Sequence, residues 1–466
     1  MVNPFLTRRQ LLRVGFSGLG TLPLLANPLV IPEKVQAGSL NSSQTQNKKP
    51  GKARIKRVIY LHQFGGPSQF ETFDMKPNAP AVIRGTFKPI STSIPGYPIC
   101  EALPRIAKLV DKLTILRSIE HRMTNHNSAG YYSLTGFAPP TDDQRLRDSP
   151  DLFPAFGSIV DRFAPAQKGI PTFVSYPHII ADGSITPGQH ASFLGKAHDP
   201  FFFQQDPNKS DFALPELQLP DNLSLNRLQS REEMLKMIDN QSESLQRSMI
   251  GRGLDQSFEK AVQMLTATEF KKAFDLSAEP ESVRSRYGKT TYGQGCLLAR
   301  RLAEVGAKFI TVYFSRSIGG DLGGWDTHGF DSKPMDPILK NYLLPITDLS
   351  VSALLEDLMQ RGMFDDTLVL WMGEFGRSPR INKLAGRDHW PRCFTAFMAG
   401  GGLKQGFVYG SSDRQGAFPD SNPIKIEDIS ATIYHLLGID PQTEFQDKLG
   451  RPFPISKGNV IQDILV

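Results

Sequence analysis

Cysteine is scarce in this chain, which has three among its 466 residues, at Cys100, Cys296 and Cys393. An odd number with no C-x-x-C pair argues against a disulfide framework and against a thiolate zinc cluster. We therefore expect all three cysteines to be buried structural thiols.

A strong excess of basic charge is also missing. The formal net charge is +6, and about half of it comes from the first 37 residues. No basic stripe with interleaved aromatic residues occurs, so the sequence gives no reason to expect a nucleic-acid partner. The rest of the composition is that of a globular protein, with 39% hydrophobic and 21% charged residues in a chain long enough to bury a large core.

The first 37 residues are typical of an export signal. Arg8 and Arg9 precede a moderately apolar run over residues 14–31, and a small-residue cleavage site follows at 35–37. This pattern resembles a twin-arginine signal, although an ordinary secretory signal or an uncleaved membrane anchor remains open. We expect export to the periplasm or the cell exterior, with no membrane span once the signal is removed.

The remaining chain is predicted to form one main domain. Residues 38–55 are rich in Ser, Asn, Gln and Lys, which predicts a flexible linker. Residues 56–466 form the domain, and its less regular part, at about 139–286, is interpreted as an insertion that covers the site like a cap. An independent second domain is the alternative for that part.

Short apolar runs alternate with longer helical patterns along residues 56–466. The predicted strands lie at Val58 to Leu61, Leu113 to Leu116, Thr172 to Tyr176, Phe309 to Phe314, Thr367 to Trp371 and Phe394 to Met398. The predicted helices lie at Leu103 to Val110, Tyr292 to Val305, Leu339 to Gln360 and Ile426 to Leu437. This alternation predicts an α/β fold with a mostly parallel central sheet and helices on both faces.

Candidate metal ligands follow several of these strands, where the loops of a parallel sheet converge. Asp326 and His328 are two residues apart, so an extended loop turns both to one side; a surface turn is the bland alternative. Glu374 emerges from a buried strand between two glycines, and an ion pair with Arg377 is its alternative. His389 adds a second imidazole, unless it merely stacks on the adjacent tryptophan. Carboxylates and imidazoles are the ligands that a divalent cation requires.

Taken in order, these segments resemble the alkaline phosphatase superfamily. Residues 366–376 are similar to that family's strand ending in Asp-His-Gly or Asp-Asn-Gly, and residues 428–439 are similar to its terminal helix. The resemblance implies an alkaline phosphatase or sulfatase-like fold. It also implies that the metal ligands are Asp326, His328, Glu374 and His389.

The resemblance breaks down at the nucleophile. The family places a Ser, Thr or modified Cys ten residues before the Gly of a Thr-Gly pair, and here that position is His126. A C-x-P-x-R sequence is also missing, which disfavours a formylglycine sulfatase. His126 is open to three roles, as nucleophile, metal ligand or general base, and to none at all. Ser128 as a displaced nucleophile and a slip in the match remain alternatives.

The full set of motifs is similar to the twin-arginine-exported domain-of-unknown-function 1501 family. The match includes residues 65–68, with Ser68, and the segments 325–328, 373–377 and 386–390. The family's Asp residues after the first strand are replaced by His62-Gln63-Phe64. Glu71 and Asp74 are the alternative candidates to compensate, and Asp74 is the predicted metal ligand.

The resulting hypothesis is an exported metal-dependent hydrolase of phosphate or sulfate esters in small molecules or glycans. Imidazole ligands favour zinc, with calcium or manganese as alternatives. His126 and Arg377 are the candidate catalytic residues, and Asp388, Arg387 and Ser68 are candidates to bind the anion or orient ligands. The competing hypothesis is a non-catalytic metal- or ligand-binding protein that keeps this fold. The sequence does not indicate an oligomeric state.

Overall fold

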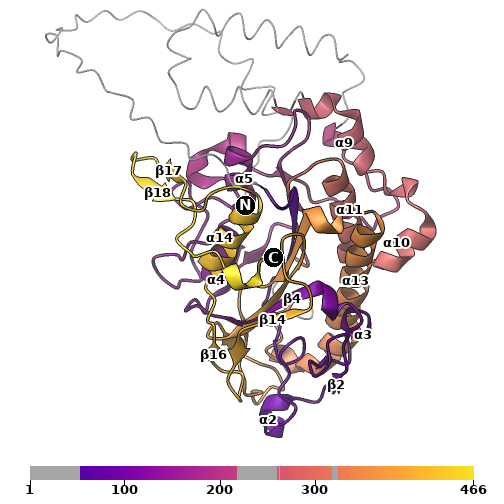
Figure 1. Ribbon diagram of the computed structural model, residues 1–466, viewed down its shortest axis with the longest axis vertical. Helices are drawn as coiled ribbons and strands as arrows, with labels where there is room; N and C mark the ends of the chain where they lie inside the picture. The colour runs from indigo at the N-terminus through magenta and orange to yellow at the C-terminus, as the bar shows by residue number, and fades with distance from the viewer. Residues whose placement is uncertain (1–52, 218–259, 262, 317–323) are drawn as a thin grey trace, which may run out of the picture. The chain divides into compact units, whose positions relative to one another are not determined.

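The computed structural model of the chain describes residues 53–217, 260–261, 263–316 and 324–466 (Figure 1). The predicted export signal, residues 38–52 of the predicted linker and part of the predicted insertion lie outside the described residues.

An eight-stranded sheet forms the centre of the domain. Its strand order is β14-β4-β13-β10-β1-β9-β5-β8. The bounds are β14 (Phe407–Tyr409), β4 (Leu113–Ile119), β13 (Phe394–Gly400), β10 (Thr367–Met372), β1 (Arg57–His62), β9 (Phe309–Tyr313), β5 (Phe173–Tyr176) and β8 (Phe201–Phe202). All neighbours pair in parallel except β13, which is antiparallel to both β4 and β10. The predicted mostly parallel sheet is confirmed.

Helices cover both faces of this sheet (Figure 1). On one side lie α3 (Pro104–Ala107), α10 (Glu281–Tyr287), α11 (Thr291–Glu304) and α13 (Leu344–Gln360). On the other side lie α4 (His126–Thr135), α5 (Phe156–Phe163) and α14 (Ile426–Leu436). Shorter elements include α2 (Ala81–Arg84), α9 (Thr268–Ala273), α12 (Met335–Ile338) and the hairpin of β11 (Gly376–Arg377) with β12 (His389–Trp390).

The strands are buried on both faces, which explains why their sequences are continuous apolar runs. In β1, Ile59 and Leu61 belong to the core under α11 and α13, whereas Val58 and Tyr60 belong to the core under α14. Side chains alternate between the faces because a strand has a period of two residues. The sequence therefore shows no polar alternation.

The predicted helices are found close to their predicted bounds. The exception is the first: Leu103 to Val110 contains only one α-helical turn, α3, followed by a 3-10 turn at Val110–Lys112. The stretch Met335–Gln360 is apolar enough to span a membrane, with a mean hydropathy of 1.2 in its best window. However, 61% of that window is buried, as in the core helix of a globular domain.

The described part of residues 139–286 contributes to the main domain. It supplies α5 to one face of the sheet and β5 and β8 to one edge. At its start, the carboxylate of Asp142 accepts hydrogen bonds from the backbone N–H groups of Thr124 and Asn125, at 2.8 and 3.0 Å. This contact anchors the segment that enters α4.

Candidate metal centre

The strand directions bring the candidate residues to one edge of the sheet. The carboxyl ends of β1, β4, β9 and β10 share this edge because these strands run in the same direction. His126 follows β4, and Glu374 follows β10. β13 runs in the opposite direction, so its amino end reaches the same edge and places His389 there.

Three imidazoles point their Nε2 atoms at one carboxylate, that of Asp326. The Nε2 atoms of His328 and His389 lie 2.9 and 3.1 Å from Asp326 Oδ1, and 2.8 Å from each other. His126 Nε2 lies 3.5 Å from Asp326 Oδ2. Ligand atoms of His126, Asp326 and His389 all lie within 4.8 Å of one another, which is close enough to share one cation.

The other ring nitrogen of each imidazole, Nδ1, contacts an oxygen atom of the protein. His126 Nδ1 lies 2.6 Å from Glu374 Oε1, and His389 Nδ1 lies 2.7 Å from the carbonyl oxygen of Thr124. His328 Nδ1 lies 3.3 Å from Asp388 Oδ1. Metal-binding histidines characteristically use one nitrogen for the ion and the other for a carboxylate or carbonyl group. All three rings show this arrangement.

Glu374 is fully buried, and its two oxygens differ. Oε1 accepts hydrogen bonds from His126 and from the backbone N–H of Gly65 at 2.8 Å, whereas Oε2 has no partner among the described residues. Gly65 has a φ of +110°, and a Cβ there would lie 2.5 Å from the backbone nitrogens of Trp325 and Asp326. Glycine is therefore required for the loop after β1 to approach the Asp326 loop.

The charges of the cluster differ from those of isolated side chains. Burial raises the pKa of Asp326, but Arg377 and the imidazoles outweigh it and hold the pKa well below its usual range. Burial also raises the pKa of Glu374, yet its hydrogen bond with His126 lowers it overall. Both carboxylates are therefore ionised at neutral pH, as a cation requires.

The pKa values of His126 and His389 are shifted in opposite directions. Burial favours neutral His126, but the adjacent carboxylates of Asp326 and Glu374 outweigh burial and raise its pKa to about 9. Burial lowers the pKa of His389 to about 4, although Asp326 favours its charged form. Without a cation, His126 is therefore a doubly protonated, positively charged imidazolium at neutral pH.

The side chain of Arg377 contacts this site from the protein interior. Its guanidinium is fully buried and donates to Asp326 Oδ1 at 2.5 Å. It also donates to the carbonyl oxygens of Gly65, Gly66, Trp325 and Arg387. Arg377 therefore orients Asp326 and ties together the loops that follow β1 and β10. Among the described residues, Arg377 pairs with Asp326 and Glu374 pairs with His126, so the ion pair between Glu374 and Arg377 that was the alternative from the sequence is not found.

Three other predicted site residues lie outside the cluster. Asp74 is within 3.1 Å of Lys76 and 3.4 Å of Arg117, and it also binds Ser412. The Arg387 guanidinium is fully buried and pairs with Glu71 at 2.6 Å, and Ser68 donates to the same carboxylate. The bonds that the structure shows for these residues join parts of the fold to one another.

The donor set fits a divalent cation. Buried polar atoms normally have hydrogen-bond partners. However, both His126 Nε2 and Glu374 Oε2 are buried without a hydrogen bond among the described residues. An imidazole-rich set with one or two carboxylates favours zinc over calcium or magnesium, which prefer oxygen ligands. The predicted ligands Asp326, His328 and His389 converge, His126 joins them, and Glu374 stands directly behind His126.

Two contacts at the site were missed from the sequence. His121 Nε2 donates to the carbonyl oxygen of Glu374 at 2.7 Å, and its Nδ1 accepts from the N–H of Met123 at 3.0 Å. The carbonyl oxygen of Thr124 orients His389. The position of His121, two residues after the apolar run of β4, was an available signal.

Solved structures with a similar fold include sulfatases and related hydrolases. The PsFucS1 sulfatase from Pseudoalteromonas sp. is 12% identical with a TM-score of 0.37, and the match covers 83% of this chain and 68% of that chain. A protein in the alkaline phosphatase superfamily from Vibrio parahaemolyticus is 11% identical (TM-score 0.37; 84% and 68% covered). The phosphonate monoester hydrolase of Agrobacterium radiobacter is 13% identical (TM-score 0.38; 88% and 77% covered).

The family comparison is more extensive. No curated protein matches the chain. The profile of one family, described as "Protein of unknown function (DUF1501)", matches residues 55–465, which includes every residue of the candidate metal centre. The chain therefore belongs to the DUF1501 family.

Proposed function

We propose that the chain is an exported, metal-dependent hydrolase of phosphate or sulfate esters. The observation that carries the proposal is the arrangement around Asp326, where three imidazoles present Nε2 inward and are held at Nδ1 from behind. Sites that only bridge loops do not require all three rings to share one orientation. The donor types favour zinc.

In this proposal, Asp326, His126, His328 and His389 hold the cation, and Glu374 orients His126 from the side of its Nδ1. When bound, a divalent cation polarises an ester oxygen and lowers the pKa of water, so that hydrolysis needs no covalent nucleophile. Arg377 fixes the Asp326 carboxylate, and Glu374 holds a proton at His126 Nδ1, which leaves Nε2 directed into the site.

The experiment is elemental analysis of the purified chain, combined with hydrolysis of 4-nitrophenyl phosphate and 4-nitrophenyl sulfate. We expect about one or more zinc equivalents per chain and turnover of at least one ester. A protein without stoichiometric metal contradicts the proposal.

The second candidate is a non-catalytic metal-binding protein. The contacts of Ser128, the serine near the expected nucleophile position, favour it. Ser128 Oγ is turned away from the cluster and bonds the backbone of Asp143, donating to its carbonyl at 3.0 Å and accepting from its N–H at 2.8 Å. Among the described residues, no hydroxyl or thiol is hydrogen-bonded to the side chains around Asp326. A zinc-loaded protein that is inert towards both esters would support this candidate.

Export is proposed from the sequence alone, by the twin-arginine route. The test is the paired substitution Arg8→Lys and Arg9→Lys, with fractionation of cells that produce the full chain. We expect the variant to accumulate in the cytoplasm with its metal bound, whereas export at the normal level contradicts this route.

A further inference from the structure

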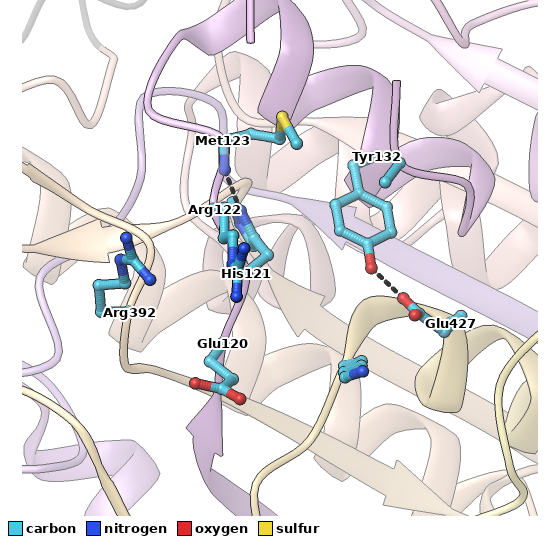
Figure 2. Close-up of a pocket in the computed structure, with 9 residues that line it drawn as sticks. Glu120, His121, Arg122, Met123, Tyr132, Arg392 and Glu427 are labelled. Carbon is cyan, nitrogen blue, oxygen red and sulfur yellow. Dashed lines mark hydrogen bonds between the residues drawn. The ribbon is translucent and has the colours of Figure 1, made fainter. Parts of the chain in front are cut away.

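The described part of the chain contains a pocket of about 370 Å³ (Figure 2). Its wall is formed by residues 120–123, which follow β4, with Tyr132 of α4, Arg392, and Lys425 and Glu427 at the start of α14. Figure 2 shows Arg392 on one side and the hydrogen-bonded pair of Tyr132 and Glu427 on the other, with residues 120–123 between them. The volume is at the lower end of the range for small-molecule sites.

The pocket and the metal centre share a wall. His121 lines the pocket, and its Nε2 donates to the carbonyl oxygen of Glu374. Three residues further along, the carbonyl oxygen of Thr124 holds His389, and Arg392 itself follows His389 by three residues. The pocket and the cluster around Asp326 are therefore connected through His121 and through two short chain segments, at residues 121–124 and 389–392.

The charged side chains of the pocket differ in whether they have a partner among the described residues. Glu427 accepts a hydrogen bond from Tyr132, and the His121 ring is bonded to the backbone at both nitrogens. In contrast, within the described residues no carboxylate pairs with the exposed guanidinium groups of Arg122 and Arg392. Lys425 adds a third cation, so three positive side chains face the two carboxylates of Glu120 and Glu427.

Two guanidinium groups line the pocket, and neither is paired with a carboxylate of the described residues. They match an oxyanion, because each presents a planar fork of donors. The arginines that the sequence suggested for this task, Arg377 and Arg387, are fully buried and bonded to the protein itself. We propose that the pocket is a second anion-binding subsite, built on Arg122 and Arg392, for a further acidic group of the ester substrate. This inference rests on the proposed function and extends it: the preferred substrate is an ester that bears at least two anionic groups.

The test measures binding of three disaccharide probes by titration calorimetry at low salt, using Glu374→Gln protein to prevent turnover. One probe carries a single sulfate, the second carries two sulfates, and the third carries one sulfate and one uronate. We expect the two doubly charged probes to bind roughly tenfold more tightly than the first, as a charged hydrogen bond contributes. The difference between sulfate and uronate identifies the preferred group.

The preference is expected to fall below about twofold in the double variant Arg122→Ala and Arg392→Ala. Arg105→Ala is the matched control, because Arg105 is an exposed arginine of α3 on the other face of the sheet, and it is expected to keep the preference. Equal binding of the three probes, or a preference that survives the double variant, overturns the inference.

The two proposals fail separately. Zinc content and turnover of 4-nitrophenyl esters in the unmodified chain test the hydrolase, and neither measurement involves a second acidic group. Turnover without a preference for doubly charged probes overturns only the subsite. If the double variant loses the preference but the unmodified chain hydrolyses no ester, the anion-binding subsite is supported and the hydrolase is overturned.

Discussion

His126 and Glu374 form a buried pair in which the imidazole Nδ1 lies 2.6 Å from the carboxylate Oε1, although the residues are 248 positions apart. The pair connects the first turn of α4 with the end of β10, and it turns His126 Nε2 towards Asp326. A carboxylate behind an imidazole fixes the ring and increases its basicity. The histidine at the expected position of the nucleophile is therefore part of the cluster around Asp326.

Replacement of His126 tests this assignment. We expect His126→Ala to weaken zinc binding by more than the roughly 10–100-fold that loss of an outer partner of a ligand causes. Hydrolysis should fall with it, because both depend on the same ring. His435→Ala is the control, since His435 is a partly exposed histidine of α14 with no side-chain hydrogen bond among the described residues. Zinc titration of the metal-free proteins measures the effect, and equal affinities in the two variants would exclude His126 as a ligand.

Zinc binding should release one proton from His126 at neutral pH. Its pKa in the folded, metal-free protein is raised from 6.5 to about 9, so the proton must leave before Nε2 can bind a cation. We expect zinc affinity to rise up to about tenfold per pH unit between about pH 6.5 and 8. Calorimetry in buffers of different ionisation enthalpy counts the proton. The raised pKa also stabilises the metal-free fold below about pH 6.5, and this contribution is lost as pH rises through about 9.

Asp388 is predicted to support His328 from outside. Its carboxylate faces His328 Nδ1 and also accepts a hydrogen bond from the side chain of Asn382 at 3.0 Å. We expect Asp388→Asn to weaken zinc binding roughly 10–100-fold with little loss of stability, because the Asp388 side chain is 62% exposed. The control is Asp331→Asn, an exposed carboxylate three residues after His328. Unchanged zinc affinity in Asp388→Asn would contradict the support role.

The sequence predicted the sheet well because its signals are local. A buried parallel strand is an apolar run, and β1, β9 and β10 were found within two residues of their predicted bounds. Asp326 and His328 were paired correctly because two residues of an extended segment share one side. These features depend on near neighbours in the chain.

Long-range partners could not be predicted in the same way. Arg387 pairs with Glu71 across 316 positions, and a fully buried arginine has no sequence pattern that distinguishes it from an exposed one. Asp74 suited a metal ligand by position, but the structure surrounds it with Lys76 and Arg117. The tertiary contacts decide which carboxylates meet a cation and which meet a guanidinium.

Gly65 should be intolerant of any side chain. We expect Gly65→Ala to destabilise the domain and to weaken zinc binding, because the added Cβ would displace the backbone of Trp325 and Asp326. Gly96→Ala is the matched control: Gly96 also has a positive φ, of +79°, but no atom lies within 4 Å of its Cβ position. Its cost should be limited to backbone strain, about 1 kcal/mol or somewhat more. Urea unfolding compares the two, and equal losses would show that the close approach is unimportant.

The pair of Glu71 and Arg387 is predicted to stabilise the fold. Glu71 is 1% exposed, and Arg387 is fully buried, stacked on Phe70 at 4.4 Å and bonded to the carbonyl oxygen of Ile83. Glu71→Gln leaves the guanidinium without its counter-charge in a dry interior, so we expect a loss of about 3–5 kcal/mol in the free energy of unfolding.

An exposed pair provides the comparison. Glu269 lies 2.9 Å from Lys272 on the surface of α9, and Glu269→Gln should change the free energy of unfolding by less than about 1 kcal/mol. If Arg387 instead bound the substrate anion, Glu71→Gln would leave stability intact and change only the KM for the ester. Urea unfolding and steady-state kinetics on the same two variants separate these outcomes, because a structural pair affects the unfolding midpoint before it affects KM.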